Sequence, residues 1–203
     1  MADKQLETKL VHAGRSKKYT LGSVNSVIQR ASSLVFDTVE AKKQATHNRA
    51  NGALFYGRRG TLTHFSLQEA MCELEGGAGA VLTNTGMSAI HLVTTVFLKP
   101  GDLLVAPHDC YGGSYRLFDS LAKRGCYRVL FVDQGDEQAL QAALAEKPKL
   151  VLVESPSNPL LRVVDIAKIC QLAREAGAVS VVDNTFLSPA LQNPLALGAD
   201  LVL

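Results

Sequence analysis

The sequence predicts an α/β fold in which helices cover a mostly parallel β-sheet. Three observations predict it. Short apolar runs recur from residue 80 onward, and helix-length segments with apolar residues at spacings of three and four separate them. Aspartate and glycine stand where several of those helices would begin and end. Runs that are apolar on both faces are typical of parallel strands buried on each side, so a layered sheet is the expected core.

The expected strands are six runs of five or six residues. They are "AVLTN" (80–84), "LLVAP" (103–107), "RVLFVD" (128–133), "KLVLVE" (149–154), "AVSVVD" (178–183) and "ADLVL" (199–203). Helices are expected between them, for example over "DEQALQAALAE" and "DIAKICQLAREA". Asp136 and Asp165 precede these two segments as N-caps, and Gly125 and Gly177 lie where helices would stop.

Residues 1–63 differ from the rest, because Gly, Ser, Asn and basic residues are mixed among short apolar groups without a sustained period. We interpret this stretch as an extended N-terminal arm with little fold of its own. It leads into a helix expected over "THFSLQEAMCELE" (63–75). The chain is therefore divided into an arm, 1–63, and an α/β domain, 64–203.

Composition narrows the class of protein. With 203 residues, 47% of them hydrophobic and 20% charged, the chain can bury a substantial core. No apolar stretch approaches the roughly 20 residues of a membrane span, and the charged N-terminal sequence does not have the pattern of a secretory signal. A net charge of +2 gives no reason to expect nucleic acid or membrane partners. The four cysteines form no CxxC pair and the histidines are dispersed, so we expect reduced thiols, no metal site and a cytoplasmic protein.

Candidate ligand-binding residues follow the expected strands, because ligands bind outside the carboxyl ends of strands in open α/β sheets. After the first run, "TNTGMSA" places Gly86 at a helix start, where free N–H groups and the helix dipole favour phosphate. After the second, Tyr111 can lie flat against a planar ligand. Asn158 in "ESPSNP" can donate to a ligand oxygen, and Asp183 ends "AVSVVD" as a carboxylate at the edge of the core.

Each of these residues also has an ordinary role without a ligand. Gly86 can permit a tight turn, and Tyr111 can be a surface or core aromatic. Asn158 can start a turn before proline, and Asp183 can cap a helix or accept main-chain N–H bonds. Taken together they fit one ligand, pyridoxal 5′-phosphate, whose phosphate, ring, ring hydroxyl and protonated nitrogen match them in turn. Cys110, beside Tyr111, is a weak candidate for a thiol nucleophile because the sequence places no partner base for it.

The motifs also resemble the fold-type I pyridoxal phosphate enzymes of cysteine and methionine metabolism, a family that includes cystathionine γ-synthase and cystathionine β-lyase. They are "YGRRGTLT" (56–63), "ELEGGAGA" (73–80), "TNTGMSAIHLV" (83–93), "HDCYGGSYRLF" (108–118), "ESPSNP" (154–159) and "VVDNTF" (181–186), and the resemblance covers essentially the whole chain. Residues 1 to about 72 resemble an enterobacterial β-lyase. Residues from about 79 onward resemble an enterobacterial γ-synthase, as in a hybrid of the two.

The resemblance implies a fold-type I large domain that binds pyridoxal 5′-phosphate. Gly86 and Met87 would then offer backbone N–H groups to the phosphate. Tyr111 would stack on the ring and take part in acid–base chemistry. Asn158 would bond the ring hydroxyl, and Asp183 would bond the pyridine nitrogen.

The resemblance also implies roles for residues that the strand pattern does not single out. Tyr56, as a catalytic residue, and Arg58 would reach the phosphate of a neighbouring subunit's cofactor, in a homotetramer built as a dimer of dimers. Without the resemblance, "GRR" (57–59) reads as an exposed basic turn. Arg116 matches an arginine that in the γ-synthase branch meets the distal carboxylate of the substrate. Phe55 matches the β-lyase branch instead, so the implied substrate pocket is mixed.

The implied activity is that of a transsulfuration enzyme of methionine biosynthesis, which joins O-succinylhomoserine to cysteine and releases succinate. The alternatives are a β-lyase that cleaves cystathionine to homocysteine, pyruvate and ammonia, and a noncatalytic fragment. In the family, the lysine that binds the cofactor covalently follows shortly after "ADLVL". Lys168, the last lysine here, lies inside an expected helix. We therefore expect the C-terminal part of the fold to be absent and the chain to be inactive by itself.

Overall fold

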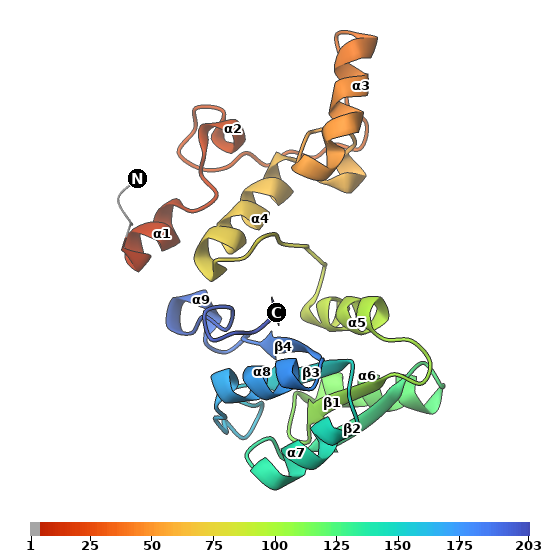
Figure 1. The fold of residues 1–203 in the computed structure, drawn as a ribbon. Helices are drawn as coiled ribbons and strands as arrows, with labels where there is room; N and C mark the ends of the chain where they lie inside the picture. Colours follow the sequence, from red (N-terminus) through yellow and green to blue (C-terminus); the bar gives the residue numbers. More distant parts are fainter. Residues whose placement is uncertain (1–4) are drawn as a thin grey trace. The chain divides into compact units, whose positions relative to one another are not determined.

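The computed structural model describes residues 5–203, which form two compact units that divide between Leu82 and Thr83 (Figure 1). Residues 1–4, the start of the charged N-terminal sequence, lie outside the described residues. The division therefore follows helix α4 (Leu62–Glu75), whereas the sequence pattern places the end of the arm before it.

The second unit is built on a parallel β-sheet, as the doubly apolar runs predict. Its strands are β1 (Leu103–Pro107), β2 (Arg128–Val132), β3 (Leu150–Glu154), β4 (Val179–Asp183) and β5 (Leu201–Val202). They lie in the order β2-β1-β3-β4-β5, and every neighbouring pair is parallel. The sheet of the described residues is thus confirmed for five of the six expected runs.

Helices cover both faces of this sheet (Figure 1). The helices of the unit are α5 (Gly86–Phe97), α6 (Gly112–Lys123), α7 (Glu137–Ala145), α8 (Ile166–Glu175) and α9 (Ser188–Leu191). Val105 and Val151 pack with residues of α7 and α8 in one apolar cluster, and the next residues along, Ala106 and Leu152, pack with residues of α5 and α6 in another. Because successive strand side chains point to opposite faces, both faces of β1 and β3 are buried.

The expected helix ends are present. The carboxylate of Asp136 accepts hydrogen bonds from the amides of Gln138 and Ala139, and that of Asp165 accepts one from Lys168, so both cap as predicted. Gly125 and Gly177 follow α6 and α8 with φ values of 77° and 76°. That left-handed conformation, which ends a helix, is available to glycine at little cost.

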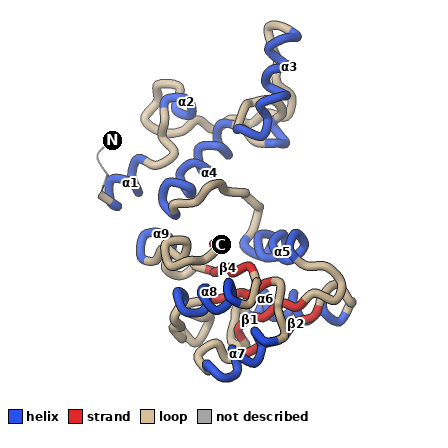
Figure 2. The backbone as a smooth tube through the Cα atoms, viewed as in Figure 1, coloured by secondary structure: helices blue, strands red, loops and turns tan. Residues whose placement is uncertain are grey.

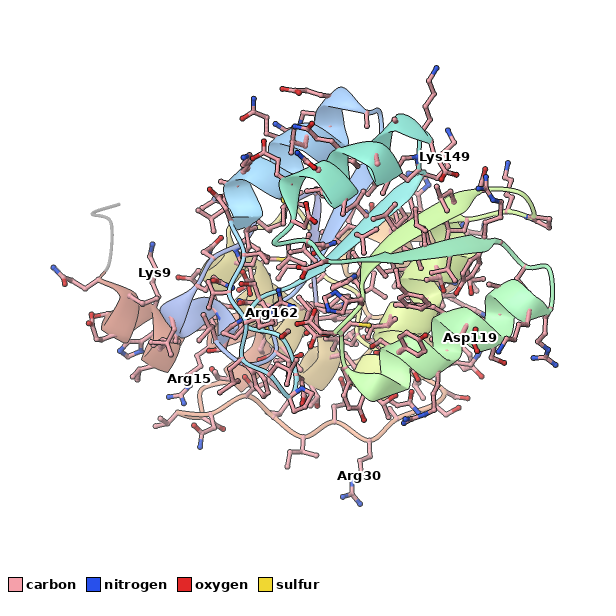
Figure 3. The ribbon with its side chains drawn as sticks, turned by 90° about the horizontal axis from the view of Figure 1, so that it is seen from below. Lys9, Arg15, Arg30, Asp119, Lys149 and Arg162 are labelled. Carbon is pink, nitrogen blue, oxygen red and sulfur yellow. The ribbon has the colours of Figure 1, made fainter. Side chains whose placement is uncertain are left out.

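The strand order also locates the crevice of the sheet. From β1 the chain crosses to β2 on one side and then to β3 on the other, so the order reverses between β1 and β3. Lys149 directly precedes β3, and Arg162 lies in the loop that follows it; both residues are labelled in Figure 3. In doubly wound sheets, ligands bind at such a reversal, outside the carboxyl ends of the strands.

One strand prediction is wrong. Residues 80–84 form no strand, and Val81 is 76% exposed. A strand needs a neighbouring chain for its backbone hydrogen bonds, and none of the described strands pairs with this run. The final run forms the two-residue strand β5, which is shorter than expected.

The first unit contains helices and loops, and Figure 2 shows no strand in its described residues. Its elements before α4 are short: α1 (Leu6–His12), α2 (Lys17–Thr20), α3 (Val39–His47) and the 3-10 turns Asn48–Asn51 and Gly57–Arg59. Side chains fasten this segment to α4. Tyr19 donates to Glu69 at 2.8 Å, and Ser66 donates to the Gly14 carbonyl at 2.8 Å. The arm therefore has local helices but depends on α4 for its buried contacts.

Among residues 5–203, no helix is long and apolar enough to cross a membrane.

Candidate functional site

A cavity of about 290 Å³ lies at the carboxyl edge of the sheet in the second unit. This volume is near the lower end of the roughly 300–1,000 Å³ that is typical of ligand pockets. Its walls come from the start of α5, the start of α6, the loop after β3 and the loop after β4. All five cofactor-binding candidates within this unit line it, namely Gly86, Met87, Tyr111, Asn158 and Asp183. The reversal in strand order thus coincides with the predicted residues.

The first wall is the N-terminus of α5. The Thr85 hydroxyl caps the helix by accepting from the Ser88 amide at 3.0 Å. The amides of Gly86 and Met87 come before Ser88 and have no acceptor in the described part of the chain, as is usual in a first turn. A Cβ built on Gly86 would meet nothing within 4 Å, and its φ is not positive. The backbone therefore does not require glycine for a tight turn, and its missing side chain leaves the cavity open beside two free donors.

The second wall is Tyr111, which is 43% exposed and precedes α6. Its ring lies so close to Gly113 that a Cβ there would collide with Cε1. The same Cβ would meet the Sδ of Met87 at 2.9 Å. Gly113 therefore provides the space in which the tyrosine ring lies, a role that the sequence pattern does not reveal.

The third wall contains Asp183 at the end of β4. The side chain is half-buried at the edge of the core, beside the cavity. Its Oδ1 accepts from the Thr185 amide at 3.1 Å and from the Thr185 hydroxyl. Asp183 therefore accepts one main-chain N–H bond, which is part of the ordinary role expected without a ligand. Oδ2 has no protein partner within residues 5–203, which leaves one carboxylate oxygen for a cationic ligand.

Glu154 was missed by the sequence analysis, although it ends β3 as Asp183 ends β4, and the two residues are register partners across the parallel pair. Glu154 is 6% exposed. Its Oε2 accepts from the Tyr111 amide at 2.9 Å, and its Oε1 accepts from the Asn158 amide at 2.7 Å. The carboxylate therefore joins the loops that carry two of the predicted residues.

The carboxylates give the cavity a negative character. Burial, together with the charges of Glu154 and Asp109, raises the pKa of the Cys110 thiol to about 12. A neutral, buried thiol is a poor nucleophile, so the weak candidacy of Cys110 is not supported. Burial likewise raises the pKa of Glu154, against the lowering effect of the Tyr111 and Asn158 amides. The negative charge of Asp183 also raises the pKa of Glu154, so a cation bound beside Asp183 would relieve the repulsion between the two carboxylates.

The remaining predicted residues do not line the cavity. Phe55 and Tyr56, in the first unit, make an edge-to-face contact with ring centroids 6.3 Å apart, and the Arg58 guanidinium lies 5.2 Å from the Tyr56 ring. Two hydrogen bonds lower the pKa of Tyr56; the one with Ser32 has the larger effect and the one with Arg58 the smaller. Arg116 is exposed on α6 and reaches back toward Gly112, where a Cβ would meet its Nη1 at 3.3 Å. Their roles stay predictions.

The arrangement fits a ligand with a phosphate, a flat ring and a positive charge. Free amides at a helix start suit the phosphate, and the half-exposed tyrosine offers a ring face. The open oxygen of Asp183 suits a protonated ring nitrogen. Pyridoxal 5′-phosphate has all three features, and Asn158 lies in the same cavity for its ring hydroxyl.

Comparison with known proteins gives a consistent result. The sequence model described as "Cys/Met metabolism PLP-dependent enzyme" matches residues 7–203. The cystathionine γ-synthase of Escherichia coli (strain K12) is 91% identical over 148 residues, which cover 73% of this chain and 38% of that protein. The cystathionine β-lyase of Salmonella typhimurium is 49% identical over 203 residues, which cover 99% of this chain and 51% of that protein.

A solved structure of cystathionine γ-synthase from Xanthomonas oryzae pv. oryzae, in complex with cystathionine, is also similar. It has a TM-score of 0.89 and 48% identity, over 99% of this chain and 50% of that chain. The chain thus spans about half the length of the relatives it matches, or less.

Proposed function

Because the chain belongs to the Cys/Met metabolism family of PLP-dependent enzymes, we propose that its second unit binds pyridoxal 5′-phosphate for a cystathionine γ-synthase reaction. In that reaction O-succinylhomoserine and cysteine form cystathionine, and succinate is released. The identity of 91% to a γ-synthase over most of the chain supports this choice of reaction. The observation that carries the cofactor is the cavity in which four separate segments bring together Gly86, Tyr111, Asn158 and Asp183.

Each wall of the cavity has a role in holding the cofactor. The amides of Gly86 and Met87 bind the phosphate at the positive end of α5. Tyr111 packs on one face of the ring, and its hydroxyl takes part in proton transfer. The side-chain amide of Asn158 donates to the ring hydroxyl, while its backbone amide is bonded to Glu154.

Asp183 keeps the ring nitrogen protonated. Thr185 donates to Oδ1, so Oδ2 would be the oxygen left to accept from the protonated ring nitrogen. When bound, pyridoxal phosphate draws electron density from the substrate's Cα, and the proton on its nitrogen increases that effect. The chain's own contribution is therefore a fixed negative charge on the carboxylate of Asp183.

Binding of pyridoxine 5′-phosphate tests this role. The probe has the ring and phosphate but no aldehyde, so surface lysines cannot capture it. Equilibrium dialysis should detect binding to the 203-residue chain, and Asp183→Asn should weaken it about tenfold, since a charge-assisted hydrogen bond is lost. Glu146→Gln is the matched control, because Glu146 is an exposed carboxylate paired with Arg128. Equal affinity of wild type and Asp183→Asn would contradict the proposal.

A second candidate reaction is the β-lyase cleavage of cystathionine to homocysteine, pyruvate and ammonia. The identity of 49% to a β-lyase over nearly the whole chain and the presence of Phe55 favour it. An active form that includes the rest of the family's fold would separate the two, because one releases succinate and the other pyruvate. Arg116→Ala should impair succinate release more than pyruvate release. A homotetramer in the cytoplasm, with Tyr56 and Arg58 reaching a neighbouring subunit's phosphate, completes the proposal.

A further inference from the structure

We propose that Glu154 is a positioning residue that holds Tyr111 and Asn158 at the cavity, an inference that rests on the proposed binding of pyridoxal 5′-phosphate. The residue itself donates nothing to a ligand. It acts through the backbone of the two loops whose side chains meet the ring and the ring hydroxyl.

The geometry of the contacts carries the inference. The Tyr111 amide points between the two carboxylate oxygens, at 2.9 Å from Oε2 and 3.2 Å from Oε1. The Asn158 amide donates to Oε1 at 2.7 Å. Tyr111 is 43 residues before Glu154 in sequence and Asn158 is four after it, so a single carboxylate closes one long-range and one local link.

The location of Glu154 distinguishes this link from ordinary loop bracing. Glu154 lines the cavity and is the register partner of Asp183, so it lies at the floor between the two loops it holds. A second link between the same loops runs from the Ser157 hydroxyl to the Asp109 carboxylate at 2.8 Å, and neither of these two residues lines the cavity. Within residues 5–203, only the Glu154 link ends directly on the backbone amides of Tyr111 and Asn158.

The cost of keeping a carboxylate there also needs an explanation. A buried acid next to a second acid is unfavourable unless its hydrogen bonds offset the burial. Two backbone amides provide those bonds, and nearly all of the side chain is removed from solvent. A glutamine of the same shape would keep one acceptor oxygen and turn an NH₂ group toward the other site. If the glutamine oxygen takes the place of Oε1, the Tyr111 amide loses its shorter bond, and if it takes the place of Oε2, the Asn158 amide loses its bond.

The test compares wild type, Glu154→Gln and the control Glu146→Gln in the full 203-residue chain. Hydrogen exchange of single amides, followed by NMR, should become about tenfold faster at Tyr111 or at Asn158 in Glu154→Gln, because glutamine offers one acceptor oxygen where the carboxylate offers two. Exchange within β3 and β4 should not change. Glu146→Gln should leave all of these rates as they are in wild type.

Ligand binding supplies a second readout. Glu154→Gln should weaken pyridoxine 5′-phosphate about tenfold but leave inorganic phosphate unaffected, because the α5 N-terminus does not depend on Glu154. A general loss of structure would weaken both probes. Wild-type exchange at both Tyr111 and Asn158 in the variant, or equal affinity for pyridoxine 5′-phosphate, would overturn the inference.

Failure of the proposed function has a different signature. If wild type binds no pyridoxine 5′-phosphate, the cofactor proposal fails, whereas the exchange rates still decide whether Glu154 holds the two amides. If Glu154→Gln does not fold, Glu154→Asp replaces it, since it keeps the charge but withdraws the carboxylate by one methylene. The same pattern of faster exchange at Tyr111 and weaker ring binding is expected, and wild-type values for both would contradict the inference.

Discussion

Arg162 donates from Nη2 to both carboxylate oxygens of Asp133, at 3.0 and 2.8 Å, and so joins the loop after β3 to the end of β2. Its Nη1 lies 3.3 Å from Nε2 of His108, which follows β1. One guanidinium therefore connects the segments that follow three neighbouring strands. Hydrogen bonds from Arg162 and then from the Gly135 amide lower the pKa of Asp133 below its ordinary value of 3.8.

This ion pair gives a pH-dependent prediction. Because the pKa of Asp133 is lowered on folding, the pair stabilises the fold above the pKa of the unfolded chain, and that contribution is lost as the pH falls through the folded value. Both side chains are more than a third exposed, so solvent screening keeps this contribution small. Arg162→Ala should lower the free energy of unfolding slightly at pH 7 and by less at pH 3, in urea titrations. A loss of equal size at both pH values would contradict this account.

The close packing of Gly113 against Tyr111 predicts a contrast between two adjacent glycines. In Gly113→Ala the new Cβ would collide with the Tyr111 ring, so binding of pyridoxine 5′-phosphate should weaken several-fold. In Gly112→Ala the Cβ would meet only the flexible end of Arg116 at 3.3 Å. That variant should keep its affinity and gain up to about 0.5–1 kcal/mol in stability, because alanine favours a helix. Equal affinities of the two variants in equilibrium dialysis would show that the collision is unimportant.

The four free cysteines should differ in reactivity toward a thiolate-directed reagent. Cys126 is exposed and should be alkylated readily by iodoacetamide at pH 8. Cys110 and Cys170 are buried, and burial raises the pKa of both thiols, so they should react only after unfolding. Peptide mass mapping would identify the modified sites, with Cys126→Ser as the control for background labelling. Early modification of Cys110 in the folded chain would contradict the buried, protonated thiol.

The N-caps of α7 and α8 should each contribute to stability. Asp136→Ala and Asp165→Ala remove the oxygen that accepts first-turn amides, and each should lower the free energy of unfolding by about 1 kcal/mol. Asp136→Asn and Asp165→Asn keep an acceptor oxygen and should cost much less. Urea denaturation of the four variants would measure this. A similar loss for Asn and Ala would show that charge, and not the hydrogen bond, is what matters.

The strands were the most predictable part of the fold. β1 matches its expected run, and β3 and β4 each begin only one residue later than expected. These strands are predictable because both of their faces are covered and their sequences are therefore mostly apolar. The run at 80–84 has similar composition but no neighbouring strand in the described residues. Local sequence indicates that a segment can be a strand, whereas only the rest of the chain decides whether it has a partner.

In the candidate site, too, local sequence predicts some residues, whereas others depend on contacts with distant parts of the chain. Asp183, Tyr111 and Asn158 were found by the simple rule that ligands meet the carboxyl ends of strands. Glu154 satisfied that rule equally well and was passed over, since nothing in its neighbourhood in sequence indicates a bond to an amide 43 residues away. Gly113 was missed for a similar reason, because the need for a missing Cβ arises from where the Tyr111 ring lies.

The pairing of β3 with β4 limits how the length of this chain can vary. Val153 is aligned with Val182 and Glu154 with Asp183, so both carboxylates leave the sheet at the same level. One residue inserted within 179–183 would rotate every following side chain to the opposite face and turn the carboxylate of Asp183 away from the cavity. One inserted in the turn at 176–178 would leave this alignment intact. We therefore expect insertions and deletions among related sequences to collect in the turns, with the span between Val179 and Asp183 constant.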